Sequence, residues 1–178
     1  MERDPPTPAG VPGLRLRPAG ASDAGLILEL IRELAGFERL SHEVVADAAA
    51  LRRHLFGERP AAEVLIAEVG DAPAGFALHF PTFSTCVGKP GLYLEDLFIR
   101  PAYRGRGIGR AVLIHLSRLA VERGCGRLEW SVLDWNEPAI AFYRKLGAVP
   151  MDDWTIQRVS GDALLALAAS DEQGGVRT

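Results

Sequence analysis

Apolar and polar side chains alternate along residues 14–17, and this spacing predicts a half-buried strand. From residue 26 onwards apolar side chains recur every three or four positions, which predicts an amphipathic helix. Ser22 and Asp23 precede this repeat and are good helix-capping residues. The apolar members of the repeat are Leu26, Ile27, Leu30, Ile31 and Leu34.

The same periodicities predict a mixed series of strands and helices as far as residue 168. Strands are expected over residues 63–69, 74–80, 92–99, 128–133 and 154–159, and helices over 43–56, 108–123, 137–146 and 162–168. Residues 70–73 have hairpin-turn chemistry, and Gly124 and Gly147 fit the ends of two helices. Strands on both sides of the 108–123 helix imply a βαβ unit with a parallel strand pair. The predicted fold class is α/β, with one domain over residues 14–168 and a mixed central sheet flanked by helices.

The apolar alternation changes phase within the strand expected at residues 92–99. Leu92 and Leu94 are followed by Leu97, because Glu95 and Asp96 take two polar positions in a row. Such a break is typical of a β-bulge, in which one extra residue frees backbone groups from the ladder. The alternative is a pair of edge-strand carboxylates that face solvent.

Composition narrows the class of protein. The chain has 178 residues, 48% of them hydrophobic and 24% charged, which suits one globular domain. A formal net charge of -3 argues against a nucleic-acid partner, and no apolar run is long enough to span a bilayer. Two cysteines are too few for a disulfide framework, and the four histidines lack metal-ligand spacing, so no metal is expected. We expect a cytoplasmic protein with reduced thiols.

The two ends of the chain lack a regular apolar repeat. Residues 1–13 are rich in proline and contain no apolar signal core, so a disordered tail is expected there. Residues 169–178 are expected to form a polar tail.

Residues 104–110 read Arg-Gly-Arg-Gly-Ile-Gly-Arg and lie between a predicted strand and a predicted helix. Glycines let the backbone approach a ligand closely, and the helix that follows offers unpaired N–H groups and a positive dipole end. Arginines add donors that match phosphate geometry, so the segment is a candidate diphosphate cradle. Its spacing matches neither the dinucleotide fingerprint nor a Walker-type loop. The alternative is a glycine-rich turn with solvated arginines.

Three segments together resemble a known enzyme superfamily. The pattern Arg104-x-x-Gly107-x-Gly109 follows the strand expected over residues 92–99. It resembles the coenzyme A signature of the GNAT acetyltransferases. Residues 135–148, Trp-Asn-Glu-Pro-Ala-Ile-Ala-Phe-Tyr-Arg-Lys-Leu-Gly-Ala, resemble the second signature of that superfamily. Residues 93–98, Tyr-Leu-Glu-Asp-Leu-Phe, are similar to its spermidine/spermine (diamine) and thialysine N-acetyltransferase branch. The resemblance runs from residue 14 to residue 168.

The resemblance implies a role for each matching residue. Acetyl-CoA would be the cosubstrate, held between splayed parallel strands, and no metal is required. The residues implied in cofactor binding are Leu97, Phe98, Ile99, Arg104, Gly105, Arg106, Gly107, Ile108, Gly109, Arg110, Asn136, Glu137, Pro138, Ala139 and Tyr143. Tyr143 and Glu95 would be catalytic, with Tyr143 protonating the departing thiolate, and Phe37, Glu38, Glu95 and Asp152 would face the amine. A small-molecule amine substrate and a homodimer are also implied.

The residues of the second signature also have a reading without a ligand. Asn136 is a good helix cap and Pro138 suits a first helical turn. A capped helix with Phe142 and Tyr143 in the core would therefore explain this stretch equally well. What favours the enzymatic reading is the pairing of the two signatures at proper separation.

Three classes of function stay open. The expected class is a small-amine N-acetyltransferase, and residues 83–86 (Phe-Ser-Thr-Cys) resemble the thialysine enzymes more than the polyamine enzymes, which carry an acid and a tryptophan there. A lysine-like amino acid or short diamine is therefore at least as good a candidate substrate as spermine. The alternatives are a protein lysine or N-terminal acetyltransferase and a non-catalytic acyl-CoA sensor.

Overall fold

The computed structural model describes residues 10–170. The two expected tails fall largely on residues 1–9 and 171–178, which lie outside the described residues. The chain divides into two compact units, one ending at Ser131 and the other beginning at Val132.

The first unit is built on a five-stranded sheet. Its strands are β1 (Leu14–Pro18), β2 (Glu63–Val69), β3 (Ala72–Ser84), β4 (Lys89–Ile99) and β5 (Leu128–Trp130), in the spatial order β1-β2-β3-β4-β5. Neighbouring strands are antiparallel except for β4 and β5, which are parallel. The predicted α/β class with a mixed sheet and one parallel pair is therefore confirmed.

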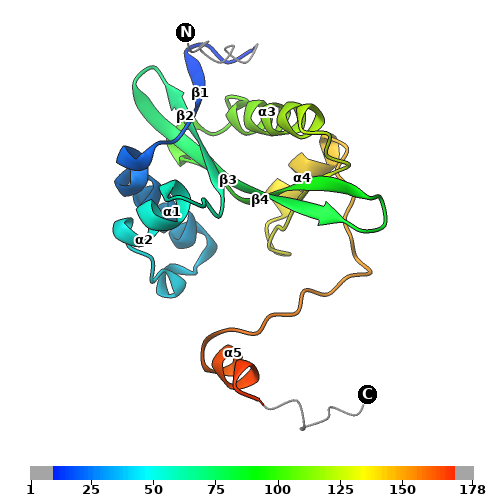
Figure 1. The fold of residues 1–178 in the computed structure, drawn as a ribbon. Helices are drawn as coiled ribbons and strands as arrows, with labels where there is room; N and C mark the ends of the chain where they lie inside the picture. Colours follow the sequence, from blue (N-terminus) through cyan, green and yellow to red (C-terminus); the bar gives the residue numbers. More distant parts are fainter. Residues whose placement is uncertain (1–9, 171–178) are drawn as a thin grey trace. The chain divides into compact units, whose positions relative to one another are not determined.

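Helices cover both faces of this sheet (Figure 1). Helices α1 (Ala24–Glu38) and α2 (Ala48–Phe56) pack on one face, and α3 (Ile108–Glu122) covers the other. Short 3-10 turns η1 (Ala21–Asp23), η2 (Ser41–Glu43) and η3 (Pro101–Tyr103) precede the three helices. The core on the α1 side consists of Ile27, Leu30, Leu34, Leu55, Ala62, Val64, Ile66, Phe76 and Phe98. On the other side Ile108, Val112 and Leu116 of α3 are fully buried.

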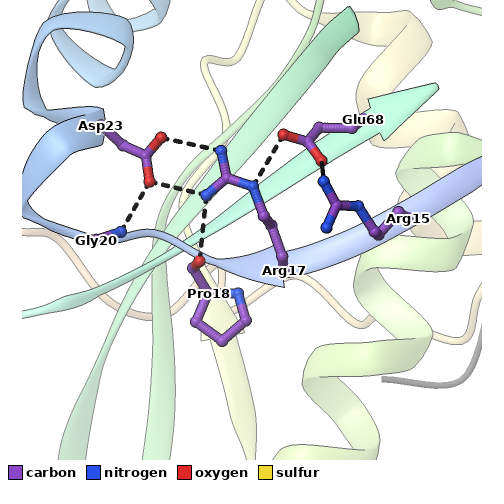
Figure 2. Close-up of polar contacts among 6 residues, drawn as sticks. All are labelled: Arg15, Arg17, Pro18, Gly20, Asp23 and Glu68. Carbon is purple, nitrogen blue, oxygen red and sulfur yellow. Dashed lines mark hydrogen bonds and ion pairs between the residues drawn. The ribbon is translucent and has the colours of Figure 1, made fainter. Parts of the chain in front are cut away.

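A polar network fixes the edge strand β1 to its neighbour and to the start of α1 (Figure 2). The Arg17 guanidinium donates to Glu68 at 2.8 Å and to both carboxylate oxygens of Asp23 at 2.8 and 2.9 Å. Arg15 forms an ion pair with the other Glu68 oxygen at 2.6 Å. The hydrogen bonds from Arg17 hold the pKa of Asp23 below its usual value. Asp23 also accepts a hydrogen bond from the Gly20 amide, so its side chain caps η1. The prediction that it caps the helix α1 is wrong, because no side-chain hydrogen bond is made at that helix end.

Other predicted boundaries in the first unit need smaller corrections. The helix expected from residue 43 begins at Ala48, because Asp47 accepts a hydrogen bond from the Ala50 amide and caps α2 there. Strand β5 ends at Trp130 rather than at residue 133. Cys86 and Cys125 are free thiols.

The second unit contains α4 (Glu137–Lys145) and α5 (Gly161–Ala168). The prediction of a strand over residues 154–159 is wrong: this segment has no regular structure and its side chains are exposed. Trp154 and Ile156 alternate with polar residues as in a strand, but a strand is stable only when a neighbour satisfies its backbone groups. Within the described part of the second unit no such neighbour is present.

Candidate active site

A β-bulge lies at Glu95, as the phase break in the sequence predicted. On strand β3, Leu78 pairs with Asp96 and the next residue, His79, pairs with Leu94, so Glu95 has no partner of its own. The extra residue changes which face of the sheet the following side chains occupy. Leu94 is opposite His79, whereas Asp96 and Phe98 are opposite Leu78 and Phe76, on the α1 side. The bulge therefore brings Asp96 to the face that α1 covers.

Beyond the bulge, one edge of β4 lacks a neighbouring strand within the described first unit. The pairing with β5 ends at Leu94 and Trp130, while β4 continues to Ile99. The Arg100 amide donates to the Ala74 carbonyl on β3 at 2.9 Å. Because backbone groups of alternate residues face opposite sides of a strand, Phe98 also faces β3, and Leu97 and Ile99 face the open edge. The pairing of the two parallel strands thus ends well before β4 does, and the edge offers hydrogen-bonding groups to an extended ligand.

Three carboxylates gather where β4 passes the end of α1. Burial, together with the negative charges of Glu95 and Glu38, raises the pKa of Asp96 to about 6. Burial also raises the pKa of Glu38, which is the last residue of α1. Among the described residues none of the three forms an ion pair or hydrogen bond with a side chain of this protein. The cluster is therefore charged, partly desolvated and uncompensated, a combination that favours binding of a cation.

The loop after β4 forms a second candidate subsite of opposite character. Gly105 and Gly107 adopt positive φ angles of 74° and 84°. Residues that carry a side chain rarely adopt such angles. Gly107 is the N-cap of α3, and no side chain caps this helix end. The first-turn N–H groups and the positive end of the helix dipole are therefore available to an anion. These residues fit a diphosphate.

The arginines of this loop occupy different environments. Arg104, predicted to bind phosphate, donates its Nε hydrogen to the Ile99 carbonyl at 2.8 Å. Its guanidinium lies 4.6 Å from the ring centre of Phe37 and 5.6 Å from that of Phe98. The guanidinium of Arg106 lies over the ring of Tyr103, and Arg110 is exposed on the first turn of α3. The side chain of Arg104 is thus directed at the core edge and at Phe37, which had been assigned to the amine side.

The remaining predicted site residues belong to the second unit. Asn136 caps α4 by accepting from the Ala139 amide at 3.4 Å, with Glu137 and Pro138 in the first turn, as predicted. Tyr143 lies on the same helix, with its ring centre 5.3 Å from that of Phe142. Asp152 lies in an exposed turn after α4. The structure thus brings Glu38 and Glu95 together in the first unit and places Asn136, Tyr143 and Asp152 in the second.

One residue of this site was not assigned a role from the sequence. Asp96 was noticed only as the second carboxylate at the phase break. The carboxylate that was predicted to act on the amine was Glu95. Asp96 is the more buried of the two and points to the α1 side, since it pairs with Leu78. The signal that could have identified it is the bulge itself, because the residue after an inserted one takes the opposite face of the sheet.

The described residues contain no metal-binding cluster and no membrane-spanning helix. No three histidine, cysteine, aspartate or glutamate side chains between residues 10 and 170 are arranged to hold a metal ion. None of the helices in the described part of the chain has the length and apolar composition needed to cross a membrane.

The acidic cluster predicts an unusual titration. Asp96 should titrate near pH 6, and Glu95→Gln or Glu38→Gln should lower its pKa because each removes a neighbouring negative charge. The measurement is a pH titration of side-chain carboxyl carbons by NMR. Glu58→Gln, an exposed acid after α2, is the matched control and should leave the Asp96 titration unchanged. An ordinary aspartate pKa for Asp96, insensitive to both neighbours, would contradict the cluster.

Known proteins resemble this chain in sequence. The profile of the acetyltransferase (GNAT) family matches residues 27–148, a span that includes the β4 edge, the loop and α4. Thialysine N-epsilon-acetyltransferase of Mus musculus is 39% identical over 165 residues, covering 86% of this chain and 96% of the relative. L-ornithine N5-acetyltransferase of Arabidopsis thaliana is 33% identical, covering 86% of this chain and 87% of the relative.

A solved structure shows the same fold. An integron cassette protein from the mobile metagenome of V. cholerae superposes with a TM-score of 0.73 at 26% identity, covering 89% of this chain and 99% of that one. Family profile, sequence relatives and fold therefore agree, and they show that this chain belongs to the GNAT acetyltransferase family and is an acyltransferase.

Proposed function

We propose that the protein transfers an acetyl group from acetyl-CoA to a primary amine on a small cationic molecule, preferably a lysine-like amino acid or a short diamine. The observation that carries this proposal is the uncompensated group of Glu38, Glu95 and Asp96 beside the open edge of β4. A cation is the natural complement of such a cluster, and an extended chain is the natural complement of such an edge.

Acetyl-CoA would supply the acetyl group as an activated thioester. It would be held by the open edge of β4 and by the glycine loop, residues 104–107. Leu97 and Ile99 offer backbone groups to the pantetheine arm, whereas the backbone groups of Phe98, also predicted to pair with it, face β3. Gly105 and Gly107 and the first turn of α3 suit the diphosphate, with Arg106 and Arg110 as charged donors. Asn136, Glu137, Pro138 and Ala139 are carried into this role by the second signature alone.

The acidic cluster has two tasks in this proposal. It attracts the ammonium form of the substrate, because three nearby carboxylates create a negative potential in a partly desolvated place. The C-terminal end of α1 strengthens that potential, since the carbonyl end of a helix is its negative pole. An alkyl ammonium has a pKa of about 10.4 and must lose a proton before it can attack. Glu95, exposed at the bulge, takes that proton directly or through water, and Asp96 and Glu38 hold the cation.

Two further groups act on the reacting atoms. A backbone N–H freed by the bulge would polarise the thioester oxygen. Tyr143 would donate its phenolic proton to the leaving sulfur. This role rests on the resemblance of residues 135–148 to the second signature, and the position of Tyr143 on a well-capped helix is consistent with it.

The choice of amine follows from what the site lacks. Long polyamines need anionic groups spaced far apart along the substrate. Ser84 and Thr85, which stand where polyamine enzymes carry an acid, provide no such charge, and the Ser84 hydroxyl accepts from Arg127 at 3.3 Å. The names of the relatives, a thialysine and an ornithine acetyltransferase, point to amino acids with a terminal amine. Asp152 remains a proposed substrate-side acid.

The experiment that tests this function is an amine panel. Thiol release from acetyl-CoA should be measured with thialysine, lysine, ornithine, putrescine, spermidine and spermine, each at several concentrations. We expect kcat/KM to be highest for the lysine-like amino acids or the short diamine, and to fall as the pH falls through about 6, where Asp96 becomes protonated.

Each other outcome of the panel has a definite meaning. The highest kcat/KM with spermine would refute the proposed preference but leave the reaction intact. Turnover with a peptide and with none of the amines would make the protein a peptide acetyltransferase. Binding of acetyl-CoA with no turnover on any acceptor would indicate a sensor.

Tyr143→Phe should lower kcat by roughly 10²-fold or more while leaving the amine KM little changed, because proton donation matters mainly in the transition state. Tyr103→Phe is the matched control, since it removes a phenol from the glycine-loop side without touching α4, and it should retain kcat. A Tyr143→Phe enzyme with kcat within threefold of the parent would show that another group is the acid.

A further inference from the structure

The side chain of Arg104 links two parts of the site that lie far apart in the sequence. Its guanidinium is 4.6 Å from the ring centre of Phe37, next to the last residue of α1, and 5.6 Å from that of Phe98 on β4. Phe37 is 41% exposed, whereas Phe98 is 3% exposed and belongs to the core. Arg104 therefore lies across the edge of the core, between the helix that carries Glu38 and the loop that contains Gly105 and Gly107.

The hydrogen bond from Arg104 fixes this position further. The Arg100 amide faces β3, so the Ile99 carbonyl in the same peptide unit points the opposite way, toward the open edge of β4. The Arg104 Nε–H donates to that carbonyl at 2.8 Å. The open edge is thus closed at its far end by a side chain of the glycine loop, and its available backbone groups are those of Leu97 and the Ile99 amide.

We propose that Arg104 is a positioning residue that braces the glycine loop against Phe37, so that Phe37 controls cofactor affinity through Arg104 without contacting the cofactor. This inference rests on the proposed function, because it assumes that coenzyme A occupies the loop. Glycines at 105 and 107 leave the loop few local restraints, and the loop must hold its amides in one arrangement to bind a diphosphate. A guanidinium fixed by one hydrogen bond and two aromatic rings supplies that restraint.

The brace would couple Phe37 to the glycine loop. By linkage, an amine that reorients Phe37 or Glu38 changes cofactor affinity, and the cofactor changes amine affinity by the same factor. A cation–π contact at an exposed site is worth about 0.5–1 kcal/mol, which corresponds to about a two- to fivefold change in a dissociation constant.

The test is a double-mutant cycle on coenzyme A affinity, measured by calorimetry on the full chain. Phe37→Leu should raise the Kd about two- to fivefold in the parent protein and leave it nearly unchanged in an Arg104→Met background, because the contact is already lost there. Phe37→Tyr keeps an aromatic ring beside Arg104, so it should leave the Kd at the parental value. Phe83→Leu, the same change at another exposed phenylalanine, is the matched control and should have no effect.

A second measurement needs no ligand. In the free protein, the Arg104 Nε–H resonance should shift on Phe37→Leu, because the proton loses the ring current of Phe37, and should not shift on Phe83→Leu. An equal effect of Phe37→Leu in both backgrounds, or an unchanged Kd with an unmoved resonance, would overturn the brace while leaving coenzyme A binding intact. A parent protein that does not bind coenzyme A would instead overturn the proposed function, and the brace's role in affinity with it.

Discussion

The bulge at Glu95 is the constraint on which the rest of the site depends. One inserted residue sends Leu94 to one face of the sheet and Asp96 to the other, so that apolar packing against α3 continues on one side of β4 while acids appear on the other. The same strand then runs on without β5 and exposes the backbone of Leu97 and Ile99. A regular strand would have kept Asp96 on the face of Leu94, away from Glu38.

The two ends of the open edge have opposite electrostatic character. At the bulge, carboxylates and the carbonyl end of α1 create a negative potential. Burial and the charges of Glu95 and Glu38 raise the pKa of Asp96, and burial raises that of Glu38. At the far end, glycines with positive φ and the uncapped N-terminus of α3 create a site for anions. A cationic amine and an anionic cofactor can therefore be drawn to one strand from its two ends, with the reacting atoms between them.

The sequence predicted the parts of the site that local chemistry determines. The phase break at Glu95 and Asp96, the glycines of the loop and the Asn136 cap all follow from residue type and spacing. The strand expected over residues 154–159 failed because pairing depends on a neighbour that periodicity cannot supply. The contact of Arg104 with Phe37, separated by 67 positions in the sequence, required the tertiary structure for the same reason.

The proposed binding of the cofactor to the backbone of the unpaired β4 edge can be tested directly. The measurement is amide hydrogen exchange of single residues, followed by NMR with and without saturating coenzyme A. The amides of Leu97 and Ile99 should become more protected when coenzyme A is added, while the amide of Phe98, which faces β3, should change little. Bound coenzyme A with no added protection at Leu97 or Ile99 would contradict the account.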